Sequence, residues 1–195
     1  MVAAFLRFVL FGLVFLFVIV NVHELGHTVF ARLLGDGSAH YVLYQEQGGS
    51  TCMGCNLYDS SRLGNVANVL VNLGGVISTQ LLGWSAIFLL GRGRPSIPRW
   101  MLLTAIVMTW SGDVILQLVQ GLVANVPQEL PRGPEHSYTD YPAVVWFLRN
   151  QTGADASDLK TGLLIGTIAY SALLLLATRW ALKRGQPRSG VTRVM

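Results

Sequence analysis

Four apolar segments of the chain are each long enough to cross a membrane, and this feature limits the possible folds more than any other. They span residues 2–34, 66–90, 100–126 and 161–182. About 20 apolar residues in a helix cross the roughly 30 Å hydrocarbon core of a bilayer. Each segment is expected to be a helix, because a helix satisfies its own backbone hydrogen bonds in lipid. The sequence therefore predicts an all-α integral membrane protein with about four transmembrane helices.

The composition agrees with this class. Of the 195 residues, 52% are hydrophobic and 12% are charged, whereas about 25% of residues are charged in a typical soluble domain. The high apolar content also excludes a disordered chain. The net charge is +4, but no run of Lys and Arg with interleaved aromatic residues indicates a nucleic-acid surface. We expect contact with the lipid bilayer and no nucleic-acid partner.

The apolar segments form one predicted transmembrane domain, residues 1–182, followed by a basic tail, residues 183–195. The connection over residues 35–65 is rich in Gly and polar residues and predicts a polar loop or a short β-hairpin after the first helix. It contains Cys52 and Cys55, which form either a disulfide or two plain thiols. The last connection is the longest, and its apolar part, residues 141–150, predicts a short helix.

The basic residues predict the orientation of the chain. With four spans, the N-terminus, residues 91–99 and the tail lie on one side of the membrane. That side, with its helix ends, holds nine of the 14 Lys and Arg residues and no acid. Since basic residues gather on the cytoplasmic side, we expect both termini in the cytoplasm, in a cell membrane of the bacterial type.

The chemistry of the chain is indicated by His23-Glu24-Leu25-Gly26-His27 near the end of the first apolar segment. This is a His-Glu-x-x-His motif. Two imidazoles at i and i+4 project from one face of a helix, which lets both bind one zinc ion at about 2.0–2.1 Å. The carboxylate of Glu24 then lies beside the metal, where it can act as a general base. Ionisable residues inside a membrane helix are expensive and therefore indicate function.

At this point the sequence resembles the site-2 protease family of intramembrane zinc metalloproteases. The motif is followed by Ala31-Arg32-Leu33-Leu34-Gly35, as is usual in that family. Asn72-Leu73-Gly74-Gly75 then resembles the small-residue motif of the family's next helix. That motif normally reads Gly-Pro, and here Gly75 stands in place of the proline.

The resemblance implies a third zinc ligand, an Asp from a later helix. Asp140 follows Asn125-Val126-Pro127 as the family's aspartate follows a similar element, although Tyr141 stands where the family has Gly. Asp140 also follows the end of the third helix, which runs in the same direction as the first. Asp113 is the rival, but its position in the middle of the third helix predicts that it lies a turn or two away from the zinc. Glu135, His136 or no third ligand are the remaining alternatives.

The function that the resemblance implies is peptide hydrolysis in or near the membrane, as a zinc metalloendopeptidase with Glu24 as base and His23, His27 and Asp140 as metal ligands. The substrate would be a membrane-protein or peptide segment. The family is thought to present such a segment as an added strand, and Tyr41-Val42-Leu43-Tyr44 is either such an edge or a plain surface loop. The alternative is a protease-like accessory subunit, idle or active, of a larger membrane complex with partner subunits.

Overall fold

The computed structural model describes residues 2–47, 50–92, 97–126 and 140–185. Four helical segments in it are long and apolar enough to cross a membrane. Three are single α-helices: α1 (Val2–Leu33), α2 (Asn65–Gly91) and α6 (Ala156–Arg184). The third span is continuous but changes its winding, from α3 (Arg99–Thr109) through a π-helix, η2 (Trp110–Ile115), to α4 (Leu116–Val123). The predicted all-α membrane architecture is confirmed.

The connections contain the smaller elements. A β-hairpin follows α1, with β1 (His40–Gln47) antiparallel to β2 (Ser50–Leu57) and His40 opposite Leu57. Of the two predicted forms of this connection, the hairpin is the one observed, and Cys55 in it is disulfide-bonded. A short 3-10 helix, η1 (Ser60–Arg62), leads into α2, and the predicted short helix before α6 is α5 (Asp140–Thr152). Most of the basic tail, residues 186–195, lies outside the described residues.

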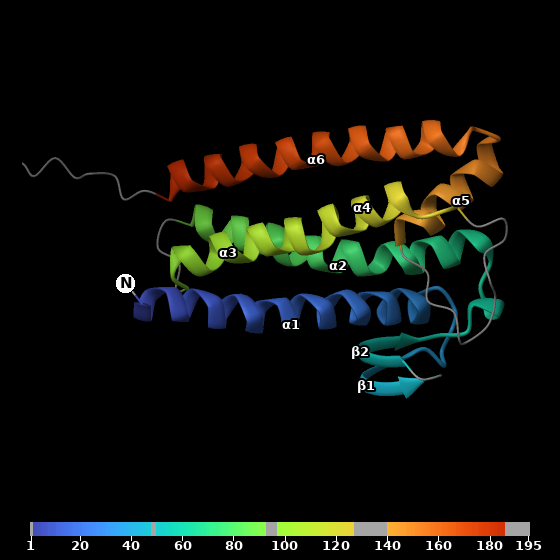
Figure 1. The fold of residues 1–195 in the computed structure, drawn as a ribbon, viewed down its shortest axis with the longest axis horizontal. Helices are drawn as coiled ribbons and strands as arrows, with labels where there is room; N and C mark the ends of the chain where they lie inside the picture. The colour runs from blue at the N-terminus through green and yellow to red at the C-terminus, as the bar shows by residue number, and fades with distance from the viewer. Residues whose placement is uncertain (1, 48–49, 93–96, 127–139, 186–195) are drawn as a thin grey trace, which may run out of the picture.

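Helix α2 is the centre of the bundle (Figure 1). It contacts α1, α3, α5 and α6, whereas α1 and α6 lie on opposite sides of it (Figure 1). The start of α1 and the end of α6 lie at one end of the bundle, and the hairpin lies beside the C-terminal end of α1 (Figure 1). The outer face of α1 is apolar and exposed, as Leu6, Leu10 and Leu13 show. Such a face fits lipid contact, because the lipid tails are as apolar as these side chains.

Glycines set the close approach between α1 and α2. A Cβ atom on Gly74 would lie 2.7 Å from Cγ of Phe30, and a Cβ atom on Gly26 would lie 2.5 Å from the hydroxyl oxygen of Ser78. Neither distance is tolerable between real atoms, so both positions need a residue without a side chain. Small residues of this kind let membrane helices pack with their backbones close together, and here they bring the histidine face of α1 against α2.

The connection after α1 is held by the buried carboxylate of Asp36. Its oxygens accept hydrogen bonds from the backbone N–H of Ser38 at 3.0 Å and of Asp59 at 2.7 Å, and Arg62 Nη1 lies 3.6 Å away. Burial alone would raise the pKa of Asp36, but the hydrogen bonds from Ser38 and Asp59 and the charge of Arg62 outweigh it and lower the pKa. Asp36 thus ties the end of α1 to the segment between β2 and α2.

Candidate metal centre

Helix α1 presents His23 and His27 one turn of helix apart, with Glu24 next to His23. The ring centroids of His23 and His27 are 4.6 Å apart, with their planes at 83°. One ligand atom from each of His23, Glu24 and His27 lies within 4.8 Å of the others. His27 is buried, and His23 and Glu24 are half-buried. The i and i+4 spacing therefore produces the shared face that the sequence predicts.

Asp140, the first residue of α5, lies against both imidazoles. Its Oδ2 is 3.1 Å from His23 Nε2, and its Oδ1 is 3.5 Å from His27 Nε2. The side chain is 2% exposed. Oδ2 lies close to His23 but has no hydrogen-bond partner among the described residues. A buried carboxylate oxygen without a hydrogen bond is rare, and here it faces the two ring nitrogens that sequence analysis assigned to a metal.

The other nitrogen of each ring faces an acceptor. His27 Nδ1 lies 2.7 Å from the backbone carbonyl oxygen of Val71, and His23 Nδ1 lies 3.1 Å from Asp113 Oδ1. A carbonyl oxygen can only accept, so Nδ1 of His27 carries the proton and donates it. The neutral ring then has its lone pair on Nε2, which is the form that binds a metal. Both Nε2 atoms consequently face the Asp140 side.

The prediction that Asp113 lies away from the histidines is wrong. His23 stands ten residues before the end of α1 at Leu33, and Asp113 stands ten residues before the end of α4 at Val123. The two helices run in the same direction, so both residues lie about 15 Å from the same end of the bundle. Asp140 reaches this depth because α5 packs against α2 and α4. Asp113 and Asp140 therefore contact the same imidazole from its two nitrogens.

Gly75 leaves space at the point where the two imidazoles meet. A Cβ atom on Gly75 would lie 2.6 Å from both His23 Nε2 and His27 Nε2. Any side chain at this position would fill the place that a metal ion between the two nitrogens needs. Sequence analysis found Gly75 only as a departure from the family's Gly-Pro, and the structure gives it a role in the site.

The hairpin approaches the motif from the side. The hydroxyl of Tyr41 in β1 donates to Asn21 Oδ1, and the hydroxyl of Thr28 donates to Asn56 Oδ1 in β2 at 2.9 Å. These two contacts flank the motif on α1. Tyr58 follows β2, and burial, together with the nearby carboxylates of Asp140 and Asp36, raises its pKa to about 12. Tyr58 therefore keeps its proton at neutral pH.

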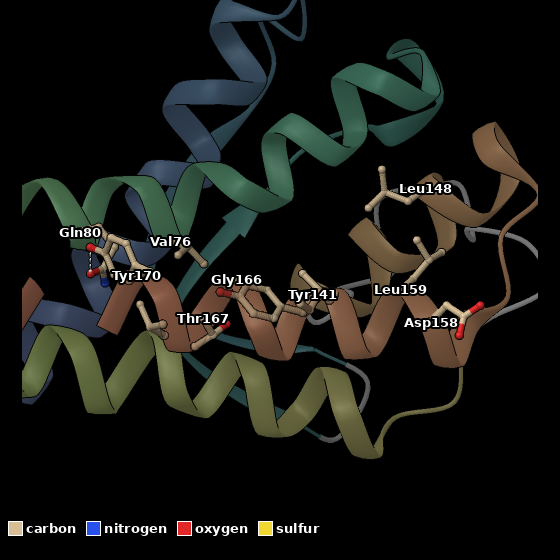
Figure 2. Close-up of a pocket in the computed structure, with 12 residues that line it drawn as sticks. Val76, Gln80, Tyr141, Leu148, Asp158, Leu159, Gly166, Thr167 and Tyr170 are labelled. Atoms are coloured by element: carbon tan, nitrogen blue, oxygen red, sulfur yellow. Dashed lines mark hydrogen bonds between the residues drawn. The ribbon is translucent and has the colours of Figure 1, made fainter. Parts of the chain in front are cut away.

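A cavity of about 490 Å³ lies next to the site, between α2, η2, α5 and α6. Val76, Val114 and Tyr141 line it, and these residues directly follow Gly75, Asp113 and Asp140. Figure 2 shows Tyr141 beside Gly166 of α6, and the hydrogen bond of 2.8 Å that Tyr170 donates to Gln80. The lining is mostly apolar, so the sequence neighbours of Gly75, Asp113 and Asp140 help to line a cavity that accepts apolar groups.

The remaining sequence candidates have different outcomes. Glu135 and His136, named as alternative third ligands, lie outside the described residues. Asp140 and Asp113 both lie at the histidines, on opposite sides of the His23 ring. The sequence does not identify the carbonyl of Val71, since every residue has a carbonyl and only the fold shows which one lies against His27. Thr79, whose hydroxyl donates to Asp113 Oδ2, was not identified either, because a threonine in an apolar helix carries no signal of its own.

The four candidate spans and the His-Glu-x-x-His cluster inside the bundle define a membrane protein that carries a peptidase motif within a candidate transmembrane helix. A family model described as Peptidase M50B-like matches residues 1–119, more than half of the chain. The chain belongs to this family, which is the site-2 protease family. The matched range includes His23, Glu24 and His27 and ends before Asp140. No curated protein and no solved structure matches the chain significantly.

Proposed function

We propose that this protein is an intramembrane zinc metalloprotease in which His23, His27 and Asp140 hold the zinc ion and Glu24 is the general base. One observation carries the proposal. Two imidazole Nε2 atoms and a buried carboxylate face the same space, and Gly75 keeps that space free of a side chain. Family membership supports the peptidase activity, and M50 peptidases are zinc-dependent in general.

The donor set fits zinc in particular. Catalytic zinc sites have three protein ligands, drawn from imidazole nitrogens and carboxylate oxygens, and keep a fourth position open. Two histidines and one aspartate meet this requirement, and the free oxygen of Asp140 gains a partner when a cation binds. When bound, zinc supplies a Lewis acid that polarises a peptide carbonyl and makes a water molecule more acidic.

Glu24 supplies the proton transfers of the hydrolysis. Its carboxylate lies within the His23–His27 group, in reach of a water molecule that attacks the peptide carbonyl. Glu24 takes a proton from this water as the new carbon–oxygen bond forms. It passes a proton to the amide nitrogen as the carbon–nitrogen bond breaks, and the amine leaves.

The substrate in this proposal is a membrane-embedded peptide segment in extended form. A helix hides its backbone carbonyls in its own hydrogen bonds, so the segment must unwind before cleavage. Strand β1 pairs only with β2 among the described residues, and its Tyr41 contacts Asn21, two residues before the motif. The free edge of β1 can take up an extended segment through main-chain hydrogen bonds.

The test begins with zinc analysis of the purified full chain and of Glu24→Gln. We expect one zinc per chain in both, because Glu24 is not a ligand. Membranes of cells that produce the wild type should contain new peptide N-termini, found by mass spectrometry, that Glu24→Gln membranes lack. Asp155→Asn, at the exposed start of α6 and outside both the metal site and the hairpin, is the control for loss of a carboxylate and should cleave like the wild type. A wild-type chain without zinc, with the same peptide N-termini as Glu24→Gln, would contradict the proposal and favour the accessory subunit.

A further inference from the structure

Asp113 is a buried carboxylate in the middle of a candidate membrane span, and the hydrolysis proposed above does not use it. Its side chain is 3% exposed. Oδ1 lies 3.1 Å from His23 Nδ1, and Oδ2 accepts a hydrogen bond from the hydroxyl of Thr79. Since an aspartate at the centre of a membrane helix is costly, its presence there indicates a function.

The helix around Asp113 has an irregular, wider turn. Residues 110–115 form the π-helix η2, and single turns of this kind occur inside α-helices mostly at functional sites. The wider turn is stabilised from α2, where Gln80 Nε2 donates to the carbonyl oxygen of Thr109 at 3.0 Å. It is also held from α6, because Trp110 Nε1 donates to the hydroxyl of Ser171 at 2.8 Å. Thr79 and Gln80 thus support the carboxylate and the unusual turn from consecutive positions.

The geometry excludes Asp113 from the ligand set. It contacts Nδ1 of His23, whereas Asp140 contacts Nε2 of the same ring. An imidazole that binds a metal through Nε2 has its Nδ1 on the far side of the ring. Ligating histidines in general donate this second N–H to a carboxylate or a backbone carbonyl, which fixes the orientation of the ring. Val71 provides the carbonyl for His27.

We propose that Asp113 is a positioning residue for the metal site, an inference that rests on the proposed function. It accepts the Nδ1 proton of His23, and so turns Nε2 toward Asp140. Its negative charge also strengthens the binding of a cation by this ring. Thr79 keeps the carboxylate in place by occupying the second oxygen. The two histidines are therefore unequal, because one is supported by a charged group and the other by a neutral carbonyl.

The test measures the affinity of the purified full chain for Zn²⁺, by competition with a chromophoric chelator. Asp113→Asn keeps the size and a hydrogen-bond acceptor but loses the charge. We expect it to weaken zinc binding about 10- to 100-fold, the usual effect of removing such a partner. Thr79→Val should weaken it less. Ser111→Ala is the matched control, because Ser111 lies in the same turn, is exposed, and donates to the carbonyl of Val107 in its own helix. Its zinc affinity should equal that of the wild type.

Two further readouts separate positioning from other roles. X-ray absorption at the zinc edge should show the same number of nitrogen and oxygen ligands in Asp113→Asn as in the wild type. The melting temperature without metal shows whether Asp113→Asn still folds, so that a loss of zinc affinity in the folded variant is assigned to the site. An unchanged zinc affinity, or one ligand fewer in the spectrum, would overturn the positioning role while zinc binding by the wild type still stands. A wild type that binds no zinc would overturn the proposed function and this inference together.

Discussion

The site has two supporting sides, and they are built by different means. On the α2 side, the backbone provides the support. The carbonyl of Val71 holds His27, and the missing side chain of Gly75 leaves room beside both Nε2 atoms. On the η2 side, a charged side chain provides it, since Asp113 contacts His23 from a locally widened helix. The α2 side therefore imposes a steric requirement that is met or not met, whereas the η2 side adds an electrostatic contribution that can be reduced in steps.

The largest effect is expected on the α2 side, from Gly75→Ala. The added Cβ atom would lie 2.6 Å from both Nε2 atoms, so we expect the variant to lose stoichiometric zinc. Elemental analysis of the purified protein measures this. Gly112→Ala is the control, because a Cβ atom there meets no other atom within 4 Å, and it should keep its zinc. Full zinc occupancy in Gly75→Ala would show that the space beside this glycine is not the metal position.

The next effect separates the two aspartates that contact His23. Asp140→Ala removes a proposed ligand, and Asp113→Ala removes a positioning residue. We expect Asp140→Ala to weaken zinc binding more than about 100-fold, beyond the usual range for a residue that only positions a ligand. Chelator competition measures both variants under the same conditions. Equal losses would contradict the distinction between a ligand and a positioning residue. A larger loss in Asp113→Ala would exchange the two roles.

A smaller effect is expected from Gly121→Leu, which acts on the site through α5. A Cβ atom on Gly121 of α4 would lie 2.8 Å from Cβ of Tyr141, the residue after Asp140. The larger side chain should therefore push the start of α5 away, at a cost of about 1–3 kcal/mol for overpacking, and weaken zinc binding by a few fold. Thermal unfolding and chelator competition measure the two parts. Gly166→Ala, where a Cβ atom meets none of the described residues within 4 Å, is the control and should leave zinc binding unchanged.

The smallest effect on the metal site is expected from Asp36, which lies outside both supporting sides. Its folded-state pKa is lowered, because the hydrogen bonds from Ser38 and Asp59 and the charge of Arg62 outweigh its burial. Folding therefore favours the charged form. The stability this contributes is present above the usual aspartate pKa of about 3.9 and is lost as the pH falls through the folded-state pKa. We expect the difference in melting temperature between the wild type and Asp36→Asn to be largest near neutral pH and to shrink below about pH 4. A difference that persists in acid would show that the charge of Asp36 is not what stabilises this connection. The zinc affinity of Asp36→Asn at neutral pH should equal that of the wild type.

The sequence predicts the features of this fold and site that depend on local pattern, but not those that depend on how the helices pack. The apolar segments and the His-Glu-x-x-His motif predict the four spans and the shared face of His23 and His27, because these depend on local periodicity. The depth of Asp113 was predicted wrongly, since it depends on how far each helix extends and where α5 packs. The π-helix has no sequence pattern that separates it from an α-helix of the same composition. The role of Gly75 depends on which helix lies opposite, and only the fold shows it.

The most direct test of the account is X-ray absorption at the zinc edge on the purified wild type and on Asp140→Ala. The account predicts two imidazole nitrogens and at least one carboxylate oxygen around zinc in the wild type, with the carboxylate contribution lost in Asp140→Ala. A wild-type spectrum with a single imidazole, or one that is unchanged in Asp140→Ala, would contradict the assignment of His23, His27 and Asp140 as the zinc ligands.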